Sequence, residues 1–328
     1  MDSLDVVGIS ASPCVDAPLI ADQGGIHTAT SQVNRRSRTS RRRALLGLAM
    51  ATPALVVVAL IVIVPLFEAA YYSLTTWNGL SSRFIGFSSY TQLFFHTVGI
   101  TQILENNLAV VVSIPLGLVL ALVAAFLTAT QVRGWRLFRS IVFLPVALSW
   151  VVIGLVFSSF LAADGGLNQL LRAVGVGQLA HDWLGNSATA LPALLGTFIW
   201  AMFGINTVIF VAGLATIPGE LFDAARVDGA GSVRIISHVV LPLMRRFVQL
   251  AFIVTLISGF TGIFGLIYVM TSGGPGFSTT TIEFQVYQEA FALGNFGTAA
   301  AMGMTLFAIM VVLTFLIGKL GGRSESVQ

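Results

Sequence analysis

Six runs of apolar residues, each long enough to cross a bilayer as a helix, dominate this chain. A transmembrane helix needs about 20 predominantly apolar residues. Hydrophobic residues make up 56% of the sequence and charged residues only 9%, whereas a soluble domain carries roughly a quarter charged residues. We therefore predict an all-α integral membrane protein with six transmembrane helices. The runs cover residues 44–71, 108–130, 141–161, 191–214, 247–270 and 298–317.

The basic residues are divided unevenly between the two sides that six spans create. Fifteen of the 17 lie in the N-terminal tail, in the links after the second and fourth runs, or in the C-terminal tail. The other two, Arg83 and Arg172, fall on the opposite side. Loops rich in Lys and Arg stay in the cytoplasm. The sequence therefore predicts that both termini are cytoplasmic (N-in, C-in).

The first 43 residues differ from the rest of the chain. They are rich in Ser, Thr, Ala and Asp and end in "NRRSRTSRRR". We interpret residues 1–43 as a disordered basic cytoplasmic tail. Its arginines are better explained as a topology anchor beside the first span than as a nucleic-acid-binding arm. Residues 44–320 then form the membrane domain, and residues 321–328 form a short cytoplasmic C-terminal tail.

Several function classes are disfavoured by what the runs lack. Ion-coupled transporters place acidic residues or His at mid-membrane, but only Glu68, near the outer end of the first run, is charged. Sodium sites built from carbonyls and hydroxyls stay open. The sequence holds no Walker A pattern for ATP, no Ser/His/Asp set and no Cys/His cluster. We therefore expect no catalytic residue, no metal site and no cofactor bound by this chain.

A polar segment interrupts the chain between the fourth and fifth runs. It reads "LFDAARVDGAGSVRIISHVVLPLM" and covers residues 221–244. Pro218 precedes it, and Glu220 and Asp223 lie near the start of a first helix, where the helix dipole favours acidic groups. The sequence Asp228-Gly229-Ala230-Gly231 predicts a turn, because glycine permits backbone angles that other residues avoid.

A second short helix is expected after this turn. Ser232 can cap it, and Leu241-Pro242 is expected to end it. An apolar face is formed at helical spacing by Val233, Ile236, Val239 and Val240. Helices of about ten residues are marginal alone in water, so this pair must pack against something. The partner is either the membrane surface or another protein.

This helix–turn–helix resembles the EAA loop of ABC importer permeases. The matching positions are Asp223-Ala224-Ala225, Gly229 and Leu241-Pro242, with Asp in place of the family's usual Glu. The resemblance implies a coupling loop over residues 215–244, whose two short helices fit a groove on a cytoplasmic ATPase subunit. The ATPase-coupling residues it implies are Glu220, Asp223, Ala224, Ala225, Asp228, Gly229, Leu241 and Pro242.

Three further stretches narrow the resemblance to the maltose-transporter-like sugar permeases. They are "FIGFSSYTQLF" (84–94), "LFRSIVFLPVALSWVVIGLVF" (137–157) and "TSGGPGFSTTTIEFQVYQEAF" (271–291). Together with the loop they extend the resemblance over residues 50–320. The resemblance also implies that the chain lies in a bacterial or archaeal cell membrane. It implies a permease for a di- or oligosaccharide that works with a second related permease, two ATPase subunits binding ATP and Mg, and a solute-binding protein.

Two kinds of alternative stay open at this stage. The same scaffold serves ABC importers of glycerol phosphate, polyamines and other small polar solutes. From another class, the chain could be an ATP-independent channel or a membrane scaffold.

A sugar pathway needs stacking aromatic residues and hydroxyl or amide groups in a mostly apolar cleft. Residues of these kinds lie in the apolar runs on both sides of the coupling loop. The alternative interpretation is that they only pack the helices together. The chain differs from the maltose permease at Ala201, Met202 and Ile205 and over residues 260–263, so the solute is not specified. The pathway candidates are Trp200, Asn206, Ser258, Thr261, Phe264 and Tyr268.

Overall fold

The computed structural model describes residues 46–47, 49–129 and 142–322. Every regular element in these residues is helical, apart from one isolated bridge between Thr75 and Phe84. The chain divides into two compact units, residues 1–65 and 66–328. The predicted tail of residues 1–43, the basic link at residues 133–139 and residues 323–328 of the C-terminal tail lie outside the described residues.

Five helices in the described part of the chain are long and apolar enough to cross a membrane, and they overlap five of the six predicted runs. The first includes a π-helical turn, η1 (Ala59–Ile63), and α2 (Val64–Tyr72). The fifth consists of α12 (Arg245–Thr261) and α13 (Ile263–Met270). The five candidate spans are Ala49–Tyr72, Ile100–Thr128, Ser187–Leu214, Arg245–Met270 and Phe296–Lys319.

The predicted continuous helix over the third run is not observed. Its described part forms a 3₁₀ turn, η2 (Leu144–Ala147), and then an 11-residue helix, α6 (Trp150–Phe160). Pro145 lacks the N–H that a longer helix would need, and the side chain of Ser149 caps α6 by accepting from the Val152 N–H at 3.4 Å. At 1.5 Å per residue, α6 is about 16 Å long, too short alone for a hydrocarbon core of about 30 Å.

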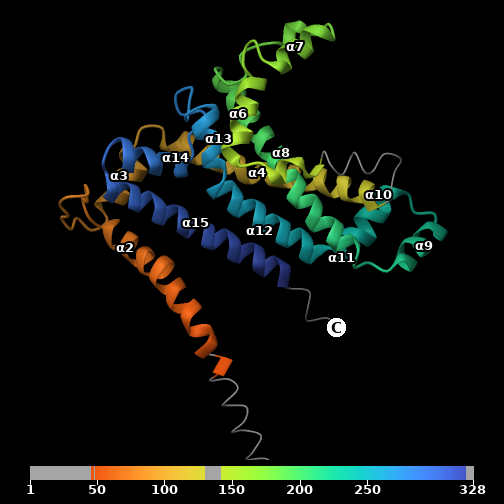
Figure 1. Cartoon of the computed structure of the whole chain (residues 1–328), viewed down its shortest axis with the longest axis horizontal. Helices are drawn as coiled ribbons and strands as arrows, with labels where there is room; N and C mark the ends of the chain where they lie inside the picture. Colours follow the sequence, from red (N-terminus) through yellow and green to blue (C-terminus); the bar gives the residue numbers. More distant parts are fainter. Residues whose placement is uncertain (1–45, 48, 130–141, 323–328) are drawn as a thin grey trace, which may run out of the picture. The chain divides into compact units, whose positions relative to one another are not determined.

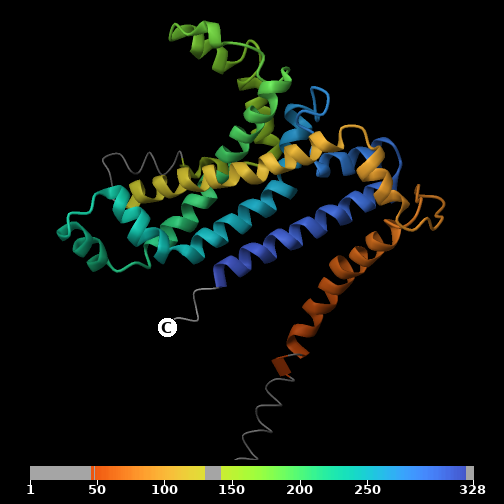
Figure 2. The same ribbon diagram turned by 180° about the vertical axis from the view of Figure 1, so that it is seen from behind.

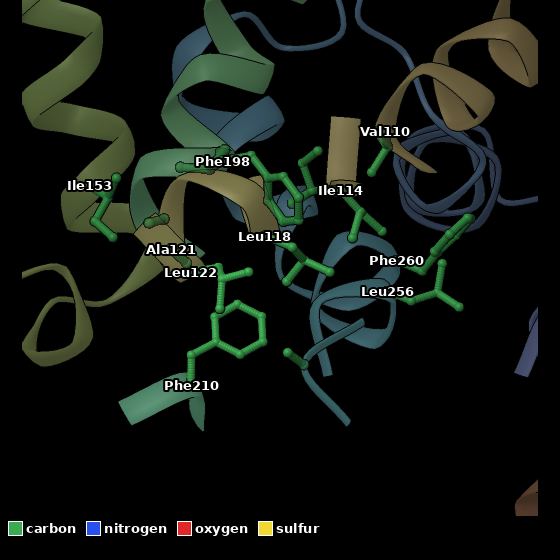
Figure 3. Close-up of a cluster of buried hydrophobic side chains, with 14 of the residues drawn as sticks. Val110, Ile114, Leu118, Ala121, Leu122, Ile153, Phe198, Phe210, Leu256 and Phe260 are labelled. Atoms are coloured by element: carbon green, nitrogen blue, oxygen red, sulfur yellow. The ribbon is translucent and has the colours of Figure 1, made fainter. Parts of the chain in front are cut away.

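The centre of the larger unit is the contact of α4 (Ile100–Ala129) with α8 (Ser187–Leu214). Figure 3 shows side chains from both helices meeting others from α6 and α12. Pro115 and Pro192 lie inside these two helices, as membrane helices tolerate when neighbours supply contacts. The buried residues at the centre include Val110, Ile114, Leu118, Ala121, Phe198, Phe210 and Leu256.

Small residues bring these helices close together. A Cβ on Gly117 would lie 3.5 Å from Ile199 of α8. At Gly204 of α8, a Cβ would lie 2.6 Å from the carbonyl oxygen of Val142. Because lipid offers no hydrophobic drive for helices to associate, this close packing contributes directly to the stability of the bundle.

Other helices of the larger unit pack beside this centre or beside one another. The last one, α15 (Phe296–Gly322), runs beside α12 (Figures 1 and 2). It also contacts α3 (Ser88–His96) and α14 (Ile282–Tyr287), which continues into the π-helical turn η5 (Gln288–Ala292). α6 packs against α13. Along the sequence, α7 (Gly166–Ala173) and η3 (Gly177–Leu179) lie between α6 and α8.

Candidate functional site

The segment predicted to be a coupling loop is a helix, a tight turn and a second helical stretch. The first helix, α9, covers Gly219–Val227 and has Glu220 in its first turn. The turn that follows contains Gly229 at φ +74°. This confirms the predicted break and the predicted positive φ, and it explains the glycine, because other residues in that region pay a steric penalty.

The turn closes α9 with a Schellman motif. The N–H of Ala230 donates to the carbonyl of Ala225 at 3.0 Å, which is the bond that defines the motif. The last α-helical bond before it runs from the N–H of Asp228 to the carbonyl of Ala224, also at 3.0 Å. Ala225 and Ala230 are half-buried and pack against the main core, as does Phe222. The inner side of α9 thus packs against an apolar cluster that includes Ile235 and Val240 of the loop itself. Asp223 and Val227 are on the exposed side, Val227 being 87% exposed.

The second stretch is longer than predicted. It begins with α10 (Ser232–Ile235), so Ser232 is its first residue rather than a residue before it, and continues through the π-helical turn η4 (Ile236–Val240) into α11 (Leu241–Leu243). Leu241-Pro242 does not end it, because Pro242 lies in the first turn of α11, where its missing N–H is tolerated.

The π-helical turn also changes which residues face inward. Ile235 and Val240 are buried, whereas Ile236 and Val239, expected on the same face, are only half-buried. A π-turn inserts an extra residue per turn and so rotates the following face. Leu241, which is 43% exposed, and Pro242 lie outward. The loop therefore presents an exposed surface formed by Leu221, Asp223, Val227, Asp228, Gly229, Leu241 and Pro242.

The six pathway candidates lie in different places. Trp200 lines an apolar groove of about 560 Å³ between α4 and α8, with its ring 5.1 Å from that of Phe157. Thr261 lines a second apolar groove of about 700 Å³ between α12 and α15, and its hydroxyl donates to the carbonyl of Ile257. Ser258, one turn earlier on α12, is half-buried.

Asn206 is buried in the helix core. Its Oδ1 accepts a hydrogen bond from Thr255 Oγ1 at 3.0 Å, which joins α8 to α12. Phe264 and Tyr268 lie on α13, where both rings contact Tyr287 of α14 at 5.3 and 5.6 Å. Trp200 and Thr261 thus line two separate grooves, and Asn206 forms a hydrogen bond between two helices. Phe264 and Tyr268 belong to an aromatic cluster. Their role in a pathway stays a prediction.

Two adjacent asparagines that the sequence analysis did not single out hold the Gly-Gly-Pro loop in place. Asn106 Nδ2 donates to the carbonyls of Phe277 and Thr280, both at 2.8 Å. Asn107 Oδ1 accepts from the N–H of Ile282 at 2.9 Å, and its Nδ2 donates to Glu283 Oε2 at 3.2 Å. The sequence alone could have pointed to them, because two adjacent asparagines just before the second apolar run are unusual polar residues at the start of a membrane helix.

The loop itself is tightly packed. Gly273 has φ +85°, and a Cβ there would lie 2.7 Å from both Phe284 and Thr280 Oγ1. The hydroxyl of Thr280 donates to the carbonyl of Gly273 at 2.9 Å. Beside it, burial raises the pKa of Glu283 from 4.5 to about 7, although the hydrogen bond from Asn107 opposes the rise. This region is a rigid, partly dry structure.

No group of three or more His, Cys, Asp or Glu side chains in the described part of the chain could hold a metal ion.

Comparison with known proteins gives one family match. The model of the family described as "Binding-protein-dependent transport system inner membrane component" matches residues 113–324, which include the whole helix–turn–helix.

Individual relatives match over most of their length. A probable ABC transporter permease protein of Bacillus subtilis, YurN, is 35% identical over 80% of this chain and 91% of its own length. The diacetylchitobiose uptake system permease protein NgcF of Streptomyces coelicolor is 32% identical, over 89% and 88%. The sn-glycerol-3-phosphate transport system permease protein UgpA of Yersinia pestis is 30% identical, over 80% and 90%.

Solved structures share the fold. A chain of a bacterial ABC transporter involved in the import of the acidic polysaccharide alginate superposes with a TM-score of 0.74, at 20% identity, over 88% of this chain and 99% of that chain. The same kind of transporter in complex with an alginate pentasaccharide-bound periplasmic protein gives a TM-score of 0.73 at 19% identity, over 87% and 96%.

Proposed function

Because this chain belongs to the family of binding-protein-dependent transport system inner membrane components, we propose that it forms half of the translocation pathway of an ATP-driven importer for a di- or oligosaccharide. The observation that carries this proposal is the exposed helix–turn–helix between α8 and α12, inside the region that matches the family.

The coupling proposal follows from the shape of that segment. Its inner side packs against the apolar cluster through Phe222, Ala225 and Ala230. Its outer side offers an apolar and acidic surface with Gly229 at the tip of the turn. Such a surface suits insertion into a groove of a cytoplasmic ATPase. ATP and Mg are then bound and used by the ATPase, not by this chain.

The proposed assembly contains a second, related permease, two ATPase subunits and an extracytoplasmic solute-binding protein. One chain with a single docking segment engages one ATPase, so a second permease is needed for the other. In the proposed topology both termini are cytoplasmic, and α6 with the residues before it completes a sixth crossing. The uneven distribution of basic residues supports this orientation.

The charge of the spans favours an uncharged solute. Basic residues in the described spans occur only at ends of helices, as Arg245, Arg246 and Lys319. A phosphate-bearing solute at mid-membrane would lack a positive partner from this chain, and unpaired buried charge is costly. A sugar needs only hydroxyl, amide and aromatic groups. The name of NgcF points the same way, while that of UgpA keeps glycerol phosphate as the alternative.

The test is solute uptake into proteoliposomes that contain the chain with the subunits that co-purify from its native host. We expect uptake of a labelled disaccharide only when ATP is inside with the ATPase and the solute-binding protein is outside. Uptake by the purified chain alone, without ATP, would establish the channel alternative. Uptake of labelled glycerol 3-phosphate but of no disaccharide would replace the proposed substrate class.

A further inference from the structure

A polar pocket of about 400 Å³ lies at one end of the larger unit, away from the grooves that hold the pathway candidates. It is formed by the segment after α2, by α3 and by the start of α15. Its volume falls within the range of roughly 300–1,000 Å³ typical of small-molecule sites. In the proposed orientation, this end faces the outside of the cell.

Two amide side chains of the pocket are held in fixed orientations by bonds within the chain. Asn78 Oδ1 accepts from the N–H groups of Leu80 and Ser81, at 3.1 and 2.9 Å, so its Nδ2 donors point away from that turn. Asn295 Nδ2 donates to Glu289 Oε2 at 3.1 Å, which leaves its Oδ1 as an acceptor. The pocket therefore offers one oriented donor group and one oriented acceptor.

Hydroxyl groups complete the polar lining. Ser89 is only 3% exposed, yet it lines the pocket, and no hydrogen bond to its hydroxyl exists in the described part of the chain. The hydroxyls of Thr76 and Thr298 likewise have no partner among those residues. These hydroxyls are therefore able to donate to and accept from a ligand or water in the pocket.

An aromatic wall accompanies these groups. Trp77 lines the pocket, stacks on Tyr72 at 4.1 Å and contacts Phe296 at 5.1 Å. These contacts fix the indole ring in place. Its N–H has no acceptor in the described residues and is free to donate to a ligand.

None of the described residues that line the pocket carries a charge. Oriented amides, free hydroxyls and an aromatic wall without charge fit a ligand that is itself polar, uncharged and rich in hydroxyl groups. We propose that this pocket is an outer binding subsite for a sugar unit of the transported carbohydrate. The proposal rests on the proposed function, and it gives that function a second, extracytoplasmic contact with the solute.

A series of aromatic rings connects the pocket with the pathway candidates. From Phe296 it passes to Phe291 at 6.3 Å, to Tyr287 at a further 5.5 Å and to Tyr268 at a further 5.6 Å. Phe291 is 74% exposed and Tyr268 49% exposed, so their faces are accessible. Phe296 and Tyr287 are half-buried between them. In the proposal, the exposed rings of Phe291 and Tyr268 offer a sugar stacking surfaces between the pocket and the pathway candidates.

The test measures sugar binding directly, without transport. The purified full-length chain in nanodiscs is examined by saturation-transfer NMR with maltose, cellobiose and diacetylchitobiose, and with glycerol 3-phosphate as the charged comparator. The double variant Ser89→Ala/Thr298→Val removes two hydroxyls that have no partner within the described chain, so the fold should be unaffected. Thr91→Val on α3 is the matched control, since Thr91 bonds only to the Ser88 carbonyl and does not line the pocket.

We expect at least one disaccharide to bind the wild type and the control equally. The double variant should bind it about tenfold more weakly or worse, because each hydrogen bond contributes roughly 2- to 10-fold. No disaccharide signal, or a signal that the double variant leaves unchanged, would overturn the proposal. So would stronger binding of glycerol 3-phosphate through the same residues.

Failure of this proposal is distinguishable from failure of the proposed function. If ATP-driven uptake of a disaccharide proceeds in proteoliposomes with an unchanged KM in the double variant, the importer stands and the subsite is refuted. If the subsite exists and contributes, the KM for uptake rises while the maximal rate and the ATPase activity without solute stay at wild-type values.

Discussion

Replacing Glu283 by Gln should change how the stability of the protein depends on pH. Burial raises the pKa of this carboxyl to about 7 in the folded protein, against 4.5 in an exposed chain. The folded state therefore binds the proton more tightly than the unfolded state. Below about pH 4.5 Glu283 is protonated in both states, and its burial does not lower the free energy of unfolding through ionisation. As pH rises from there through about 7, stability is lost, because the buried group must ionise.

The size of this loss follows from the two pKa values. Each unit of difference corresponds to about 1.4 kcal/mol, so the full loss is at most about 3.5 kcal/mol. A glutamine keeps the shape and can still accept from Asn107, but it does not ionise. We therefore expect wild type and Glu283→Gln to have similar stabilities at pH 4.5 and the variant to be more stable at pH 8.

The assay is thermal unfolding of the purified protein in nanodiscs between pH 4.5 and 8, followed by near-ultraviolet circular dichroism. Other carboxyls contribute equally to both proteins, so the difference between variant and wild type isolates Glu283. Glu220→Gln, the same change on an exposed side chain in the first turn of α9, is the control. It should be no more stable than the wild type at pH 8, because it loses only a favourable helix-dipole interaction. A constant difference between Glu283→Gln and wild type at all pH values would refute the reasoning.

Three further outcomes are expected. Asn106→Leu should lower the stability by about 1–3 kcal/mol, because the buried carbonyl of Thr280 and the part-buried carbonyl of Phe277 lose their donor; thermal unfolding and faster proteolysis of the loop check this. Gly204→Val should cost about 1–3 kcal/mol or more through overpacking between helices, whereas Gly196→Val, with open space around it, should not. In intact cells and a background without the native cysteine, a cysteine at Arg172 should react with an impermeant thiol reagent and one at Ser232 should not; the opposite pattern would reverse the topology.

Hydropathy was sufficient to predict five of the spans, because long apolar helices are determined by composition over many residues. It failed over the third run, where Pro145 and the capping Ser149 break the helix although the hydropathy does not change. Turn chemistry was also readable: the glycine pair after Asp228 predicted the turn, and Gly229 has the expected positive φ. The π-helical turn η4 was not readable, since no residue type demands it.

The site was predictable only where a local motif carried it. The helix–turn–helix follows from one contiguous stretch of sequence. The pinning of the Gly-Gly-Pro loop by Asn106 depends on residues more than 170 positions apart, and the polar pocket joins Ser89 with Thr298. Such contacts arise from the tertiary packing of α3, α4, α14 and α15, which periodicity and composition do not encode.

The central claim, that residues 215–244 couple this chain to an ATPase, is tested most directly by comparing two glycines of one turn. Both lie in open space, but only Gly229 has a positive φ. A valine at position 229 therefore strains the backbone by about 1–2 kcal/mol or more, whereas a valine at position 231 does not. The measurement is the amount of ATPase that co-purifies with equal amounts of membrane-inserted Gly229→Val, Gly231→Val and wild type. The account predicts a clear loss for Gly229→Val, beyond any loss for Gly231→Val; full retention of the ATPase by Gly229→Val would contradict it.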